Sequence, residues 1–66
     1  DKRMRRLKME CHELFDRTWD TNAERRERYA RLAGRLGIPV AECHFGYFDA
    51  PMLERALAIL KEADHD

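Results

Sequence analysis

The chain has 66 residues, of which 44% are hydrophobic and 39% are charged, with 13 basic side chains balanced by 13 acidic ones. A neutral total excludes a protein that binds phosphate over its whole surface by bulk charge, and no apolar run is long enough to span a bilayer. A chain this short buries only about 60% of its unfolded surface, so we expect one soluble domain with a thin core.

The first predicted element is a helix over about residues 2–19. Its apolar residues recur at spacings of three and four, from Met4 and Leu7 to Phe15 and Trp19. This spacing places them on one stripe of a helix, with the charged residues facing water.

A second helix is predicted over residues 22–36. Thr21 and Glu24 fit a capping box at its start, and Gly37 supplies the left-handed residue that ends it. Its narrow apolar face is expected to consist of Tyr29, Leu32, Ala33 and Leu36.

The remainder of the chain predicts a short helical turn over 39–43, an ordered aromatic corner over 45–48 and a last helix over 50–63. Asp49 can cap this helix, and Pro51 is tolerated in its first turn. The residues expected to face inward are Leu53, Ala56, Leu57 and Leu60. The predicted fold is therefore a single all-α domain of three main helices over residues 1–66.

The segment 32–43 has the small residue, turn glycine and apolar positions of a helix-turn-helix motif. Past Cys43 the pattern fails, because Gly46 would interrupt a recognition helix and residues 38–50 contain no lysine or arginine. A negatively charged helix is repelled by a phosphate-lined groove. We therefore expect a hairpin with helix-turn-helix-like packing that does not contact bases.

Charge is unevenly distributed along the chain. Residues 1–36 carry eleven basic and seven acidic side chains and residues 37–66 carry two and six, so the two parts have net charges of +4 and −4. Arginines on helix faces can bind phosphates, which predicts nucleic-acid binding. The candidate nucleic-acid-binding residues are Lys2, Arg3, Arg5, Arg6, Arg25, Arg28, Arg31 and Arg35. The alternative is an ordinary solvated surface, because glutamates at helical pair spacings lie among these residues.

Two Cys-His pairs, Cys11-His12 and Cys43-His44, provide four potential zinc ligands. Neighbouring residues on a helix point about 100° apart, whereas zinc ligands are usually two to four residues apart. We therefore expect reduced core thiols, and no cofactor. The sequence contains no phosphate-binding glycine loop and no nucleophile elbow, so we do not expect an enzyme.

Two successive stretches of the sequence together resemble a known family. They are His12-x-x-Phe15-Asp16-x-x-Trp19 and Tyr29-x-x-Leu32-Ala33-x-x-Leu36-Gly37-Ile38-Pro39-Val40-x-Glu42-Cys43-His44-x-Gly46-x-Phe48-Asp49. They are similar to the C-terminal helical part of a zinc-finger-containing domain family of unknown function from bacteriophages and bacteria. The resemblance covers about residues 8–60, and Phe45 and Tyr47 depart from the aliphatic residues or Met expected there.

The resemblance implies an upstream Cys-x-x-Cys zinc ribbon, but this chain contains no Cys-x-x-Cys, so the family's zinc cannot be placed on it. The chain begins with Asp1, and two explanations are open: the ribbon has been lost, or the chain is the C-terminal part of a longer protein that carries it. The implied location is the cytoplasm of a bacterial cell, or a phage.

The motif residues are expected to form a polar and aromatic network, in which an imidazole binds a carboxylate and the indole N–H binds a carbonyl. These residues are His12, Asp16, Trp19, Cys43, His44 and Asp49; a ligand pocket is the alternative.

Together these patterns predict a non-catalytic helical module that helps a larger assembly to engage nucleic acid. The alternative is a protein-interaction or structural module that binds a partner or a second copy of itself. Its contact surface would be the exposed part of Phe45, Tyr47 and Phe48.

Overall fold

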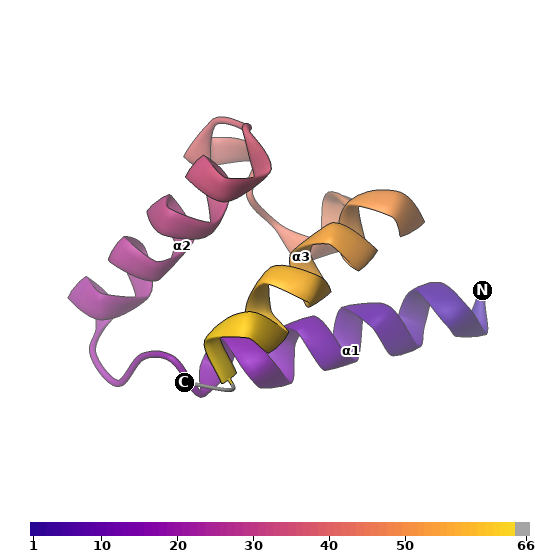
Figure 1. Cartoon of the computed structure of the whole chain (residues 1–66), viewed down its shortest axis with the longest axis horizontal. Coiled ribbons are helices and arrows are strands. Elements are labelled where there is room, and N and C mark those ends of the chain that lie inside the picture. The colour runs from indigo at the N-terminus through magenta and orange to yellow at the C-terminus, as the bar shows by residue number, and fades with distance from the viewer. Residues whose placement is uncertain (65–66) are drawn as a thin grey trace.

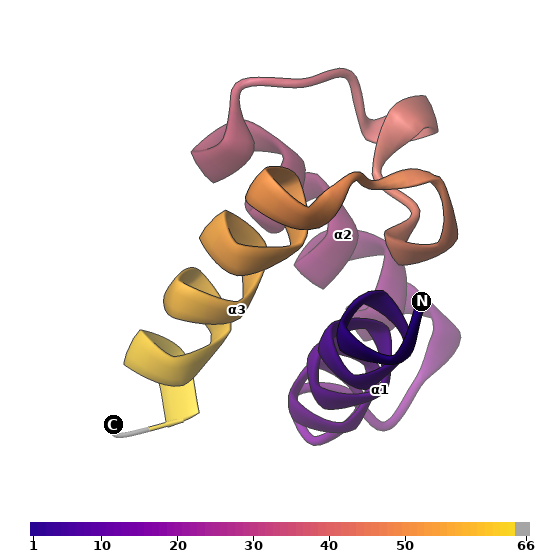
Figure 2. The same ribbon diagram turned by 90° about the vertical axis from the view of Figure 1, so that its right-hand side faces the viewer.

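The computed structural model describes residues 1–64, and in these residues it contains three α-helices, two short 3-10 turns and no strand. The elements in chain order are α1 (Lys2–Asp16), α2 (Asn22–Leu36), η1 (Val40–Glu42), η2 (Phe45–Tyr47) and α3 (Ala50–Asp64). The predicted all-α class is therefore confirmed. Helix α3 packs mainly on α1, while α2 lies to one side of this pair (Figures 1 and 2).

Helix α1 ends at Asp16, earlier than the predicted residue 19. The backbone N–H of Thr18 donates to the carbonyl oxygen of Phe15 at 2.9 Å, and the Thr18 hydroxyl donates to the same oxygen at 2.6 Å. These bonds close the last turn, because Thr hydroxyls compete with the next helical N–H for the carbonyl groups. Trp19 therefore lies in the connection to α2, although its spacing from Phe15 continues the apolar stripe of the helix.

Both ends of α2 agree with the prediction. The Glu24 backbone N–H donates to Thr21 Oγ1 at 3.1 Å, and the Thr21 N–H donates to Glu24 Oε1 at 3.1 Å, which completes the capping box. Gly37 has φ 73°, a left-handed conformation that glycine adopts without a Cβ penalty. The sequence thus determines this helix locally, through its two caps.

The predicted turn after Pro39 is present as the three residues of η1, and the aromatic corner is a second 3-10 turn, η2. Asp49 begins α3 as expected, since its Oδ1 accepts from the Met52 N–H at 3.0 Å. Helix α3 continues to Asp64, one residue beyond the prediction. A helix-turn-helix-like packing of this region stays a prediction.

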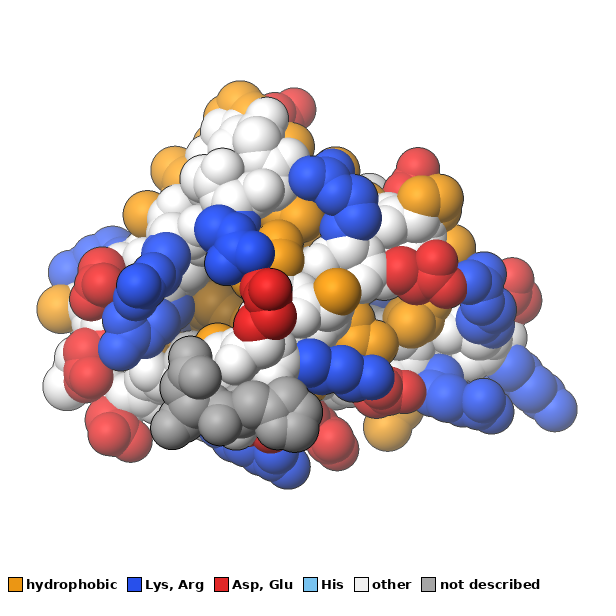
Figure 3. All heavy atoms as spheres, in the orientation of Figure 1, with side chains coloured by type: hydrophobic (Ala, Val, Ile, Leu, Met, Phe, Trp, Pro, Cys, Tyr) orange, Lys and Arg blue, Asp and Glu red, His pale blue; other side chains and the backbone are white. Residues whose placement is uncertain are grey.

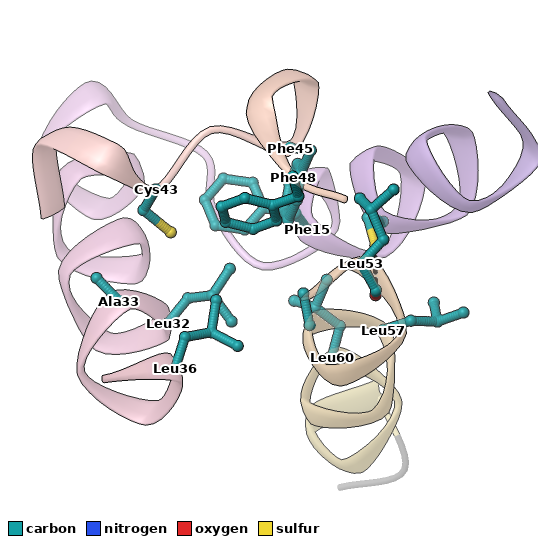
Figure 4. Packing of buried hydrophobic residues seen from close by; sticks show 12 residues of the cluster. Phe15, Leu32, Ala33, Leu36, Cys43, Phe45, Phe48, Leu53, Leu57 and Leu60 are labelled. Carbon is teal, nitrogen blue, oxygen red and sulfur yellow. Dashed lines mark hydrogen bonds between the residues drawn. The ribbon is translucent and has the colours of Figure 1, made fainter. Parts of the chain in front are cut away.

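The core contains all the inward positions predicted for α3 and three of the four predicted for α2 (Figure 4). Its centre is a group of three phenylalanine rings: Phe45 lies edge-on to Phe15, with ring centroids 5.8 Å apart, and to Phe48, at 6.0 Å. Such edge-to-face pairs stabilise beyond the area that they bury. Among residues 1–64, no helix is both long and apolar enough to cross a membrane.

Candidate nucleic-acid interface

The oppositely charged parts of the chain fold against each other. Three ion pairs join basic residues of the first part to acidic residues of α3: Arg3 with Glu54, Arg17 with Asp64 at 3.6 Å, and Arg35 with Glu62 at 2.8 Å. Their side chains are between 44% and 65% exposed, so each pair contributes only about 0–1 kcal/mol. The charge asymmetry of the sequence is thus partly used within the fold.

The eight basic residues that the sequence singles out do not form one continuous face. Lys2, Arg3, Arg5 and Arg6 lie on the first two turns of α1, which point away from α2 towards the opposite end of the molecule (Figure 1). The other four lie along α2 at intervals of three and four residues, which keeps them on one side of that helix. They are Arg25, Arg28, Arg31 and Arg35. The structure therefore separates the candidate residues into an α1 group and an α2 group.

Three residues of the α2 group, all except Arg25, border a cleft of about 500 Å³ between α2, the end of α1 and the end of α3 (Figure 3). Apolar side chains form its floor, including Leu14 and Ile59, which are only partly buried. The four arginines that line it are Arg17, Arg28, Arg31 and Arg35. Arg17 was missed by the sequence reasoning, because its position beside this cleft depends on how the three helices pack.

Arg28 is held in place more firmly than the other arginines of the cleft. Its Nε–H donates to the backbone carbonyl of Thr18 at 3.0 Å, and its Nη1 lies 3.1 Å from Glu27 Oε1. The side chain is only 32% exposed. Arg28 therefore connects α2 to the segment that precedes it, in addition to presenting charge to the cleft.

A stack of one guanidinium and two aromatic rings lies at the first turns of α2. The Arg25 Cζ atom is 4.9 Å from the ring centroid of Tyr29 and 5.6 Å from that of Trp19. Tyr29 in turn packs on the buried ring of Phe15, with centroids 4.2 Å apart. The stack is thus anchored in the core on one side, while Arg25 is exposed.

The polar network expected from the sequence motif does not form. No hydrogen bond joins any two of its six members, all of which lie in the described part of the chain. The imidazoles of His12 and His44 are exposed and make edge contacts with Phe45 and Tyr47 respectively. The other members are also separate: Asp16 is exposed, Cys43 is buried in the core and Asp49 caps α3.

The Trp19 indole nitrogen was expected to donate to a carbonyl. It is buried and has no hydrogen-bond partner in the structure of residues 1–64. The expectation was wrong because Trp19 lies outside α1, against Arg25, where its ring packs but its N–H meets no acceptor.

The aromatic corner exposes much less than the sequence suggested. Phe45 is 1% exposed and Phe48 is 7% exposed, because the turn η2 directs both rings into the core. Tyr47, between them, is 82% exposed. The predicted contact surface of three aromatic residues is therefore reduced to a single tyrosine.

The Cys-His pairs do not fit a zinc site. Cys11 and Cys43 are unbridged and buried, and Cys11 Sγ lies 3.6 Å from the carbonyl oxygen of Leu53. Burial, with a smaller contribution from Glu10, raises the pKa of Cys11 to about 11, which disfavours the thiolate that binds zinc. In residues 1–64, no three His, Cys, Asp or Glu side chains come together in a way that could hold a metal ion.

Comparison with known proteins gives one result that decides the family. A family model described as a zinc-finger-containing domain matches residues 1–63, almost the whole chain. The chain belongs to this family. The zinc-finger-containing domain family has no established function, so membership confirms the resemblance seen in the sequence without adding an activity. No curated protein and no solved structure is significantly similar to the chain.

Proposed function

We propose that this member of the zinc-finger-containing domain family is a non-catalytic helical module that engages nucleic acid through the arginine-rich side of α2. The proposal rests on one observation: four arginines occupy one side of a single helix, and three of them line a cleft together with Arg17. Guanidinium groups bind phosphate bidentately and stay charged at any physiological pH. The bacterial or phage cytoplasm implied by the sequence resemblance is the setting that we propose for this activity.

Acidic residues pair with two of the four arginines of α2, one of them Arg35 with Glu62 of α3. Glu24 is held in the capping box, where hydrogen bonds from Thr21 lower the pKa of its carboxyl group. Glu27 contacts Arg28. Arg25 and Arg31 form no ion pair with residues 1–64, so an external anion would meet them uncompensated.

The α1 group supplies an internal comparison for this proposal. Arg5 and Arg6 are exposed, carry the same charge as the arginines of α2 and do not line this cleft. A chain that binds phosphate only through its overall charge would use both groups equally. A chain that uses the α2 side would depend on Arg31 and Arg35.

The test is a salt series of binding to short single-stranded and duplex oligonucleotides, made with two charge-matched variants. Each phosphate contact contributes about −0.7 to the slope of log K against log salt for single strands, so Arg31→Gln with Arg35→Gln should make the slope shallower by about 1.4. When the salt concentration rises from 50 to 200 mM, the double variant should therefore lose about sevenfold less affinity than the unmodified chain loses. Arg5→Gln with Arg6→Gln should change the slope much less.

Two results would refute the proposal. One is the absence of salt-sensitive binding at low salt, and the other is an equal effect of the two double variants. The molar mass of the free chain, measured by light scattering on the same samples, tests the alternative function. A dimer that does not bind nucleic acid would favour an interaction module, with Tyr47 as the first residue to mutate.

A further inference from the structure

The stack of Trp19, Arg25 and Tyr29 suggests which form of nucleic acid the α2 side takes. We infer that this stack is a platform for an unpaired base, and that the ligand is single-stranded. The inference rests on the proposed function, which requires only that phosphates bind the arginines of α2.

The platform is fixed in position before any ligand binds. Tyr29 packs on the Phe15 ring at a centroid distance of 4.2 Å, and Phe15 is 1% exposed, so the lower part of the stack belongs to the core. Arg25 lies over both Tyr29 and Trp19, at 4.9 and 5.6 Å. A guanidinium held over two rings loses less rotational freedom on binding than a free arginine, which favours affinity.

The outer side of the stack is open to solvent. Arg25 is exposed, and Trp19 and Tyr29 are each partly exposed. Planar guanidinium and aromatic groups stack on nucleobases with little dependence on base identity, because every base has a π face. Bases in a duplex already have both faces covered by their neighbours, so a platform of this kind selects unpaired bases.

The phosphate-binding arginines continue directly from this platform. Arg28 follows Arg25 by one helical turn, and its bond to the Thr18 carbonyl places it beside the residue that precedes Trp19. Arg31 and Arg35 extend the same side of α2 along the cleft. A single strand lying along α2 would therefore have its backbone over these arginines and one base on Arg25.

The experiment compares an oligothymidine with an abasic oligonucleotide of the same length, which has the same phosphates but no bases. Trp19 is the only tryptophan of the chain, so its fluorescence reports on the platform directly. We expect the oligothymidine to quench Trp19 and to bind about tenfold more tightly than the abasic strand, the usual size of one stacking contact. A duplex of equal length should bind more weakly than the oligothymidine and leave Trp19 fluorescence unchanged.

A matched pair of variants separates stacking from charge. Arg25→Gln and Arg26→Gln each remove one exposed positive charge, but only Arg25 lies over the rings. Arg25→Lys retains the positive charge but removes the planar guanidinium group that would stack on a base. The tenfold preference for the strand with bases should be lost in Arg25→Gln, be reduced in Arg25→Lys and persist in Arg26→Gln.

Each outcome bears on a different claim. Equal binding of the abasic strand and the oligothymidine to the unmodified chain would overturn the base platform and leave phosphate binding intact. Equal effects of Arg25→Gln and Arg26→Gln on the preference would also overturn it. Failure of both strands to bind at low salt would overturn the proposed function, and the base platform with it.

Discussion

The 3-10 turn η2 contains a buried and an exposed ring two residues apart, and replacing each by alanine tests the packing that the structure describes. Phe45 is 1% exposed and contacts Phe15 and Phe48, so Phe45→Ala should destabilise the fold by about 3–5 kcal/mol. Tyr47 is 82% exposed, so Tyr47→Ala should change stability by less than about 0.5 kcal/mol.

The choice of assay depends on how the loss of stability in Phe45→Ala compares with the total free energy of unfolding of the chain. At about 0.05–0.15 kcal/mol per residue, a chain of this length has a total stability of about 3–10 kcal/mol. Phe45→Ala is therefore expected to lose a third or more of this stability, and Phe45→Leu, which removes fewer atoms, should lose less and supplies a folded comparison. Urea denaturation followed by circular dichroism measures all three variants. A Phe45→Ala protein as stable as Tyr47→Ala would refute the description of the core.

Three further predictions concern single residues. Asp49→Ala removes the side-chain acceptor for the Met52 N–H at the start of α3 and should lower the free energy of unfolding by about 1 kcal/mol in urea; no change would show that α3 does not need this cap. Gly37→Ala forces a Cβ into the left-handed region at φ 73° and should lower the midpoint of thermal unfolding, by about 1 kcal/mol in free energy, whereas Gly34→Ala, inside α2, should not. Burial raises the pKa of Cys11 to about 11 in the folded state, against an ordinary value of 9.0, so between these two pH values the unfolded chain loses its thiol proton first. The free energy of unfolding should therefore fall as the pH rises from 9 towards 11. The fall should be shallower in Cys11→Ala, and an identical fall in both proteins would contradict the raised pKa.

Local sequence patterns were sufficient to predict those helix ends that are determined by capping residues. The capping box at Thr21 and Glu24 and the left-handed Gly37 fix α2 residue by residue, and both are visible as sequence patterns. The start of α3 is similar, because Asp49 is a capping residue followed by proline. Predictions of this kind succeed because the hydrogen bonds that they describe join residues only a few positions apart.

The end of α1 was less predictable. Trp19 continues the apolar spacing of the helix, and this periodic signal suggested three further helical residues. The Thr18 hydroxyl binds the Phe15 carbonyl instead and ends the helix. A single short-range hydrogen bond of this type can end a helix where the apolar periodicity would continue it. The sequence patterns that predict α1 do not predict that bond.

The candidate site was the least predictable part. The pairing of Arg3, Arg17 and Arg35 with acidic residues of α3 joins positions that are 27 or more residues apart, so it depends on how the helices pack. The same holds for the burial of Phe45 and Phe48, since a short aromatic run has no periodicity that distinguishes an inward ring from an outward one. The sequence supplied the charges, and the packing of the three helices decided which of them remain available.

The most direct test of nucleic-acid engagement by α2 is an NMR titration of the 66-residue chain with a short oligothymidine, following the arginine Nε–Hε signals. The account predicts that the signals of Arg25, Arg28 and Arg31 shift on binding, while those of Arg5 and Arg6 on α1 change little. Equal shifts in both groups would indicate non-specific attraction by charge. The absence of any shift at low salt would contradict the account.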